Sequence, residues 1–362
     1  MRPAGRKSRK SGSRPVPRPP FASAVNASRK RWKSFAESSL PEIREDPLSG
    51  RLSLVAPERG RRPHDFRITP ESVETSPCPF CPGNEHLAPP EVLRLEGEAG
   101  EPWSVRVVPN KFAALEPGNP ELPWSGFLEP LPGVGRHEVL IETPEHEKAL
   151  AELKPSQVRR VLEAFCRRKE AFRAEGWCYA LFFKNHGARA GASRRHSHSQ
   201  LLALPFLPPL LRREFVRTEE FRREKGRCLF CEILEREGQG PRKILETENF
   251  LAVAAFAPRQ PLETWIFWKP HGRPFDSLTE KEQEEFAEIL LTLLQALNRT
   301  LPDLPYNFFL HLEPLRGPFP EDFHWHLELV PALTRVAGFE WGAEAYIVPL
   351  APEEAAVWLK RA

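Results

Sequence analysis

The sequence contains one ordered set of residue types twice, and this repeat limits what the chain can fold into. Each copy runs from a Cys-x-x-Cys pair through an apolar segment, a single histidine, a helical segment and a second apolar segment to a His-x-His pair. His146 and His196 lie 50 residues apart, and His271 and His324 lie 53 residues apart. Chance rarely repeats four ligand types in one order, so we interpret the pattern as an internal duplication. The sequence therefore predicts two similar halves.

Hydrophobic periodicity predicts the elements between these residues. Apolar positions at helical spacing predict a helix over residues 155–175, whose first turn suits the proline at its start. A longer apolar stripe over residues 286–297 predicts the matching helix of the second half, and Ser277 and Glu280 have the spacing of a capping box before it. Short apolar runs predict strands over residues 52–56, 137–141, 177–183, 250–256, 264–268 and 306–311.

Each half offers two thiolates and two imidazoles, the set that suits a tetrahedral zinc ion. Cys-x-x-Cys pairs can also be redox motifs, but redox chemistry needs only one pair, and a chain without a secretion signal seldom carries structural disulfides. Four protein ligands leave no position for water, so we expect two structural zinc sites. The predicted ligands are Cys78, Cys81, His146 and His196 in the first half and Cys228, Cys231, His271 and His324 in the second.

The stretch from Asn185 to Gln200 carries the residues most suited to chemistry. Its glycines and small residues let the backbone come close to a phosphate. His196, His198 and Gln200 follow at a spacing of two, so an extended chain directs all three to one face. A neutral imidazole can attack phosphorus without first losing a proton, so we interpret His198 as a nucleophile toward phosphate.

A His-x-His pair is ambiguous by itself, because closely spaced histidines are often metal ligands or polar residues that face solvent. The metal assignment uses His196 and leaves His198 outside the ligand set. In the second half no glycine-rich loop precedes His324 and no glutamine follows His326. We therefore expect one half with chemistry and one half that holds only its metal. Arginines in the loop at residues 57–63 suit phosphate binding, although clustered arginines more commonly belong to a solvated charged loop.

Charge is divided unevenly along the 362 residues. Residues 1–33 hold eleven Lys or Arg and no acid, so the rest carries 41 basic against 49 acidic residues. Residues 1–40 are predicted to be a disordered basic tail, which is a solvated extension, a nucleic-acid-binding arm or a transit peptide. No apolar run reaches the roughly 18 residues that span a bilayer, and no signal-peptide core follows the start, so we expect a soluble, cytoplasmic protein.

The central motif resembles that of a known family. Asn185-x-Gly187-x3-Gly191-x-Ser193-x2-His196-x-His198-x-Gln200, with the Cys-x-x-Cys pair upstream, is similar to the galactose-1-phosphate uridylyltransferases, the two-repeat nucleotidyltransferase branch of the histidine-triad superfamily. The resemblance covers about residues 50–355. It implies an α+β fold with two histidine-triad-like halves, each an antiparallel sheet with a helix across it. We therefore divide the chain into a tail (1–40), an N-terminal half with the active site (41–209) and a catalytically degenerate C-terminal half (210–362).

The resemblance also implies a reaction. In the family, the second histidine of the pair attacks the α-phosphorus of a nucleoside diphosphate sugar and forms a covalent nucleotidyl-histidine. The nucleotidyl group then passes to a sugar 1-phosphate, or to inorganic phosphate in the phosphorylase relatives. Carried onto this chain, His198 is the nucleophile and Gln200 hydrogen-bonds the phosphate or leaving oxygen. Positions that match substrate-binding residues of the family are Arg59, Arg62, Asn110, Asn185, Gly191, Ser193 and Glu340.

Two departures from the family pattern concern specificity. Uridylyltransferases usually have a proline between the two histidines, whereas this chain has Ser197 and looks closer to the ADP-glucose phosphorylase branch. Tyr346 stands about where the uridylyltransferases have a hexose-binding glutamine. The main expectation is exchange between UDP-glucose and galactose 1-phosphate, and the alternative is an ADP-glucose phosphorylase-like adenylyl transfer to phosphate. The non-enzyme alternative is a zinc-stapled protein that binds nucleic acid. The resemblance further implies a homodimer, and some relatives hold iron in the second metal site.

Overall fold

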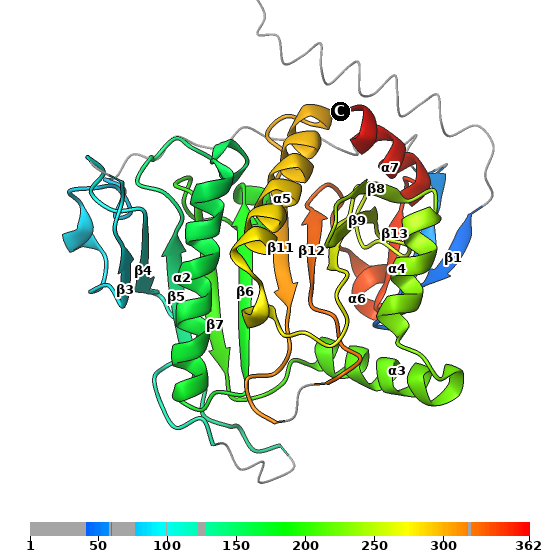
Figure 1. The fold of residues 1–362 in the computed structure, drawn as a ribbon, viewed down its shortest axis with the longest axis horizontal. Coiled ribbons are helices and arrows are strands. Elements are labelled where there is room, and N and C mark those ends of the chain that lie inside the picture. The colour runs from blue at the N-terminus through cyan, green and yellow to red at the C-terminus, as the bar shows by residue number, and fades with distance from the viewer. Residues whose placement is uncertain (1–40, 58, 60–76, 99, 122–127, 318–319) are drawn as a thin grey trace, which may run out of the picture.

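The structure is a computed structural model that describes residues 41–57, 59, 77–98, 100–121, 128–317 and 320–362. The predicted basic tail lies outside these residues. The described strands form a ten-stranded antiparallel sheet and a separate three-stranded sheet. The order of the large sheet is β3-β4-β5-β7-β6-β11-β12-β10-β9-β8, and the run from β3 to β12 can be followed in Figure 1. The predicted α+β fold class is confirmed.

The N-terminal half contributes five neighbouring strands to the large sheet. They are β3 (Leu93–Leu95), β4 (Val105–Pro109), β5 (Arg136–Ile141), β6 (Tyr179–His186) and β7 (His198–Leu204). The short 3-10 helix η2 (Glu85–Leu87) precedes these strands, and η3 (Leu150–Glu152) and η4 (Ala188–Ala190) lie between them. The long helix α2 (Pro155–Ala174) joins β5 to β6 and buries its apolar positions at the predicted spacing.

The C-terminal half repeats this order. A connector of two helices, α3 (Pro209–Lys225) and α4 (Leu229–Gln239), leads into it. Its elements are β8 (Lys243–Glu246), β9 (Phe250–Ala254), β10 (Thr264–Trp268), η5 (Phe275–Ser277), α5 (Glu280–Thr300), β11 (Tyr306–His311) and β12 (His326–Pro331). The large sheet is therefore two similar five-stranded units that meet where β6 pairs with β11.

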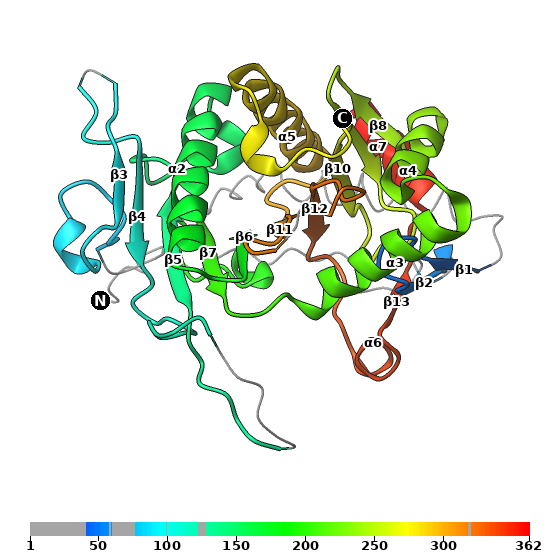
Figure 2. The ribbon, with the colours of Figure 1, turned by 60° about the horizontal axis from the view of Figure 1, so that its bottom comes forward.

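The two long helices cover one face of this sheet. α2 and α5 pack against each other across the centre of the molecule, as both views show (Figures 1 and 2). α6 (Gly338–Ala343) projects on the side of the sheet away from them (Figure 2). The small sheet, made of β1 (Glu42–Glu45), β2 (Leu52–Val55) and β13 (Ala345–Val348), lies near α7 (Pro352–Arg361) at the end of the C-terminal half. Within the described ranges, no helix is long and apolar enough to cross a membrane.

The predicted cap of the second long helix is wrong. α5 begins after Thr279, whose hydroxyl accepts from the backbone N–H of Glu282 at 3.2 Å, while the Glu282 carboxylate accepts from the backbone N–H of Thr279 at 2.8 Å. Ser277 instead ends η5 and donates its hydroxyl to the carbonyl of Pro274. Two candidate pairs share one spacing here, and the turn of 3-10 helix before α5 decides between them.

Candidate active site and metal sites

The first residue of β7 is the predicted nucleophile. His198 pairs with Ile141 of β5, and its Nδ1 lies 2.8 Å from the carbonyl oxygen of His196. A carbonyl oxygen can only accept a hydrogen bond, so Nδ1 carries the proton and Nε2 carries the lone pair. The ring of Phe80 packs 5.4 Å from the imidazole, centroid to centroid. The contact thus fixes the tautomer, and in the neutral imidazole the basic nitrogen is Nε2.

The predicted first metal group converges beside this histidine. The ligand atoms of Cys78, Cys81, His146 and His196 all lie within 4.8 Å of one another. His196 Nε2 donates to the carbonyl of Thr143 at 2.8 Å, so Nδ1 is the nitrogen that faces the thiols. Burial lowers the pKa of His196 to about 4, which keeps the imidazole neutral, as a metal ligand must be. This group can hold a metal ion.

The predicted second metal group converges in the same way. Cys228, Cys231, His271 and His324 bring their ligand atoms within 4.8 Å of one another. His324 Nδ1 donates to the carbonyl of Trp268 at 3.1 Å, so this histidine presents Nε2, whereas its counterpart in the first half presents Nδ1. Burial raises the pKa of the Cys228 thiol to about 12, so a bound metal would displace its proton.

A third group of acidic and histidine side chains was not predicted. Glu214, His311, His326 and Glu328 are buried, and their polar atoms lie within 4.8 Å of one another. Burial alone would lower the pKa of His311, but the carboxylates of Glu214 and Glu328 raise it overall. Arg259 forms an ion pair with Glu328. His311, whose pKa is raised, and Arg259 thus offset the negative charge of these two carboxylates. Charged residues inside apolar strands were the sequence signal that could have revealed it.

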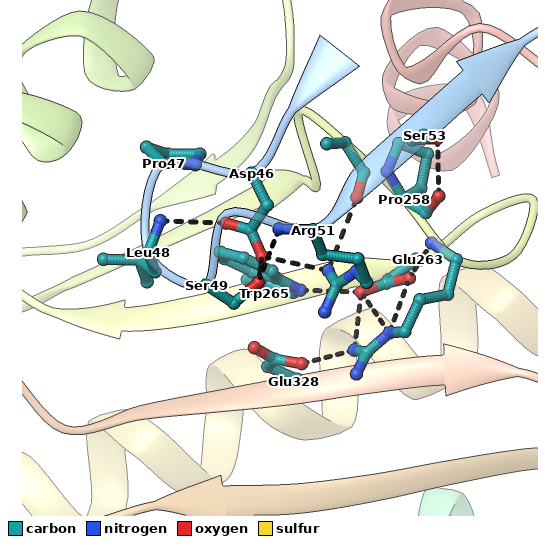
Figure 3. Close-up of polar contacts among 12 residues, drawn as sticks. Asp46, Pro47, Leu48, Ser49, Arg51, Ser53, Pro258, Glu263, Trp265 and Glu328 are labelled. Atoms are coloured by element: carbon teal, nitrogen blue, oxygen red, sulfur yellow. Dashed lines mark hydrogen bonds and ion pairs between the residues drawn. The ribbon is translucent and has the colours of Figure 1, made fainter. Parts of the chain in front are cut away.

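Figure 3 shows how this ionic group extends toward the small sheet. Arg259 also pairs with Glu263 at 2.6 Å, and Asp46 pairs with Arg51 at 3.0 Å in the turn before β2. The Ser53 hydroxyl donates to the carbonyl of Pro258 at 2.7 Å. These contacts attach the small sheet to the loop that precedes β10, and Arg259 in that loop lines the cavity described next.

An open cavity of about 2130 Å³ lies beside His198. Of the predicted substrate-binding residues, Arg59, Asn185 and Glu340 line it, and so does Tyr346. The arginines along its wall are Arg59, Arg189, Arg194, Arg195, Arg259 and Arg335. Guanidinium groups form bidentate, charge-assisted hydrogen bonds with phosphate oxygens, so this wall suits a ligand with several phosphates.

The other predicted residues do not line this cavity, and one of them is outside the described residues. Gln200 and Asn110 do not line it, but both contact His137, whose Nε2 is 2.7 Å from Gln200 Oε1 and 3.1 Å from Asn110 Nδ2. His137 was not predicted, and its one signal was a polar residue at the start of an apolar strand. Ser193 is exposed. Arg62 is outside the described residues.

The predicted phosphate-binding Asn185 is oriented from the C-terminal half. Asn307 of β11 pairs with Asn185 of β6, and its Nδ2 donates to Asn185 Oδ1 at 2.7 Å and to the carbonyl of Ala190 at 2.8 Å. Because the Ala190 carbonyl can only accept, Asn307 must turn its amide nitrogen toward it, and Asn185 must turn its oxygen toward Asn307. The Asn185 nitrogen then lies beside Gly191, where a Cβ would come within 3.6 Å of it. Gly191 has φ +88°, which favours glycine.

Comparisons with known proteins agree with this architecture. A family model described as galactose-1-phosphate uridyl transferase, N-terminal domain, matches residues 33–208. ADP-glucose phosphorylase of Arabidopsis thaliana is 35% identical over 330 residues, which cover 88% of this chain and 92% of the relative. Galactose-1-phosphate uridylyltransferase of Thermotoga maritima is 29% identical over 334 residues, which cover 88% of this chain and 98% of the relative.

Solved structures give the same result. A crystal structure of the Arabidopsis thaliana ADP-glucose phosphorylase with bound ADP-glucose has a TM-score of 0.79 and 33% identity, and the match covers 90% of this chain and 99% of that one. A uridylyltransferase structure has a TM-score of 0.69 and 30% identity, covering 89% and 98%. Fold, site and relatives together define the class, and the chain is a transferase. More particularly, it belongs to the galactose-1-phosphate uridylyltransferase family. This membership favours the enzymatic expectation over the nucleic-acid-binding alternative.

Proposed function

We propose that this protein transfers a nucleotidyl group from a nucleoside diphosphate sugar through a covalent intermediate on His198. The hydrogen bond from His198 Nδ1 to the His196 carbonyl carries the proposal, because it leaves the lone pair on Nε2. Nε2 attacks the α-phosphorus, and the bond from phosphorus to the bridging oxygen breaks, so that sugar 1-phosphate leaves with the electron pair. An oxygen of the acceptor phosphate then attacks the same phosphorus and releases Nε2.

The remaining predicted residues have binding roles in this proposal. The Asn185 amide donates to a phosphate oxygen from the side that faces Gly191, and Ser193 follows in the same loop. Gln200 donates to the phosphate or leaving oxygen, while its carbonyl oxygen is held by His137. Arg59 and Arg62 bind the diphosphate. Further from the phosphates, Asn110 contacts the nucleoside and Glu340 contacts the sugar.

Both metal groups are proposed to hold structural zinc. Zinc–sulfur bonds are about 2.3 Å long and zinc–nitrogen bonds about 2.0–2.1 Å, so a tetrahedral site separates the sulfur and nitrogen ligand atoms by about 3.6 Å. In the first group the sulfur-nitrogen distances are 3.7, 3.2 and 3.6 Å, and in the second they are 3.4 and 3.6 Å. Four protein ligands would leave no open position on either ion, so each zinc would fix chain segments together. Iron remains an alternative for the second group.

Two donors are candidates for the reaction. A uridylyltransferase reaction between UDP-glucose and a hexose 1-phosphate agrees with the family to which the chain belongs. Adenylyl transfer from ADP-glucose to inorganic phosphate is favoured by a specific observation, namely the higher identity and TM-score of the Arabidopsis thaliana phosphorylase. A cytoplasmic homodimer is part of the proposal in both cases.

Intact-protein mass spectrometry after separate mixing with UDP-glucose and with ADP-glucose, without acceptor, tests the proposal. A mass gain of one UMP or one AMP, absent in His198→Ala, is the expected result and identifies the base. His198→Ala should keep about two metal ions per chain, which separates loss of the nucleophile from loss of the fold. A gain that persists in His198→Ala, or no gain with either donor, would overturn the proposed mechanism.

A further inference from the structure

A buried polar cluster lies directly behind the proposed nucleophile. It consists of Glu142, Lys184, Ser197 and Ser199, each at most 4% exposed. Lys184 Nζ lies 2.7 Å from Glu142 Oε2 and 3.1 Å from Ser197 Oγ. Both serine hydroxyls donate to the Glu142 carboxylate. The same Lys184 ammonium donates to the main-chain carbonyl of His198 at 2.9 Å, so the cluster is bonded to the backbone of the nucleophile itself.

The cluster occupies the face of the sheet opposite the nucleophile. Strand register pairs Ile141 with His198, and the next pair along, Glu142 with Ser197, is joined by a backbone hydrogen bond of 3.2 Å. Successive side chains of a strand point to opposite faces, so the side chain of Ser199 points away from that of His198, and the hydroxyls of Ser199 and of Ser197, which also reaches the cavity wall, both turn to Glu142. A small void under the helices is lined by Glu142 together with apolar residues of α2 and α5. Charged groups therefore lie in the apolar layer of the fold.

The C-terminal half provides an internal control for this cluster. There Phe267 pairs with His326 as Ile141 pairs with His198, and β11 stands beside β12 as β6 stands beside β7. Register therefore identifies the four positions that match Glu142, Lys184, Ser197 and Ser199. They are Trp268, Leu310, Trp325 and Leu327, all apolar and at most 1% exposed. The same fold unit is thus built without any charge at these positions, in the half where no nucleophile is predicted.

Stability does not explain why the N-terminal half keeps a charged cluster. Burial alone would raise the pKa of Glu142, but Lys184 and the two serine hydroxyls lower it overall, whereas burial lowers the pKa of Lys184 in spite of Glu142. Removing two charges from water costs several kcal/mol per ion, and apolar replacements of a buried pair are often neutral or stabilising. The matching apolar positions of the other half agree with that expectation. The cluster is better explained by the group that it holds.

We propose that Lys184 and Glu142 are positioning residues that fix the main chain of His198 for nucleotidyl transfer. Lys184 holds the His198 carbonyl, and Glu142 holds Lys184 and the hydroxyls on either side of the histidine. The imidazole is anchored from the other direction by its bond to the His196 carbonyl. Backbone and ring are thereby restrained independently, which fixes the direction of Nε2. This inference rests on the proposed function.

The expected effect falls on the chemical step more than on substrate binding. Lys184 contributes to the wall of the cavity, but its ammonium is bonded to Glu142, to the Ser197 hydroxyl and to the His198 carbonyl. Substrate affinity should therefore change little when Lys184 and Glu142 are replaced. A reacting atom that is misplaced by about 1 Å can lose roughly a hundredfold in rate. We therefore expect the rate of nucleotidylation at saturating donor to fall by about 10- to 100-fold. A purely structural role would lower the amount of folded enzyme and leave the rate per folded molecule unchanged.

The test replaces the whole cluster by apolar side chains, so that no buried group keeps an unpaired charge. The variant carries Glu142→Leu, Lys184→Met, Ser197→Ala and Ser199→Ala. The single-turnover rate of adduct formation is measured by rapid quench and mass spectrometry over a range of UDP-glucose or ADP-glucose concentrations, using the donor that labels the wild type. Thermal unfolding and metal content are recorded on the same samples. Leu310→Ala is the matched control, because it disturbs the equivalent position of the other half.

A slower maximal rate with an unchanged half-saturating concentration, in a folded variant that retains its metal, is the expected result. A maximal rate within twofold of the wild type would overturn the positioning role. So would an equal loss of rate per folded molecule in Leu310→Ala. If the fourfold variant does not fold, Glu142→Gln is measured instead, and we expect about a tenfold loss because a charge-assisted hydrogen bond becomes neutral. A wild type that forms no adduct overturns the proposed function itself, which the wild-type arm reveals before any variant is compared.

Discussion

Replacing Asn307 should weaken donor binding although this residue belongs to the half without a predicted nucleophile. Its amide nitrogen donates to Asn185 Oδ1 at 2.7 Å and to the Ala190 carbonyl at 2.8 Å. Asn307→Leu keeps the approximate volume of the side chain and removes both donors. The Asn185 amide can then rotate and present its oxygen, instead of its nitrogen, to a phosphate. The variant therefore tests whether the C-terminal half orients the phosphate-binding loop.

The size of the effect follows from the two hydrogen bonds. Each is worth about 1 kcal/mol net, so the substitution removes about 2 kcal/mol in total. Part of this appears as lower stability, because the Ala190 carbonyl is buried. The remainder, about 1 kcal/mol for the bond to Asn185, corresponds to roughly a fivefold change in a binding constant. We therefore expect the donor KM to rise about fivefold, with a thermal midpoint lower by only a few degrees.

Steady-state kinetics with the donor that labels the wild type measure this effect, with unfolding and metal content as controls. Asn298→Leu is a matched control. Asn298 lines the same cavity, but its side-chain oxygen accepts from the backbone of Asp303 and does not contact Asn185. A folded Asn307→Leu protein whose KM stays within twofold of the wild type would refute the reasoning, as would an equal rise in KM for Asn298→Leu.

Three further predictions concern metal, pH and helix capping. Cys78→Ser should lose one of about two metal ions per chain and lower the thermal midpoint, since a structural metal site contributes to folding free energy; elemental analysis that finds unchanged metal would disprove the ligand set. Burial lowers the pKa of His186 to about 4, so the neutral ring is favoured in the fold. The free energy of unfolding should therefore be highest above pH 6.5 and fall by at most about 3 kcal/mol toward pH 4. Denaturant titrations at several pH values should show that the free energy of unfolding of His186→Phe falls less between pH 6.5 and pH 4 than that of the wild type. Thr279→Ala should lower the free energy of unfolding by about 1 kcal/mol, and Ser277→Ala should lower it less. Equal losses of unfolding free energy in urea titrations would contradict the observed cap.

Much of the fold was predictable because its signals are local. Helix α2 and most strands follow from apolar spacing within single segments, and the duplication follows from the order of residue types. The two Cys-x-x-Cys and histidine sets could be grouped in advance because each lies at the ends of elements that the repeat already orders. The helix cap was not predictable, since two neighbouring pairs had equal spacing and only the preceding 3-10 turn distinguishes them.

The sequence is enough to recognise which residue types recur and which faces of the strands are polar, and it predicts that His198 stands outside the metal sets. The tertiary structure alone decided which strands are neighbours. Lys184 meets Glu142 across 42 residues of chain, and Asn307 meets Asn185 across 122. Periodicity reports the face to which a side chain points but not the strand beside it, so these pairs follow from the β5-β7-β6-β11 order of the sheet.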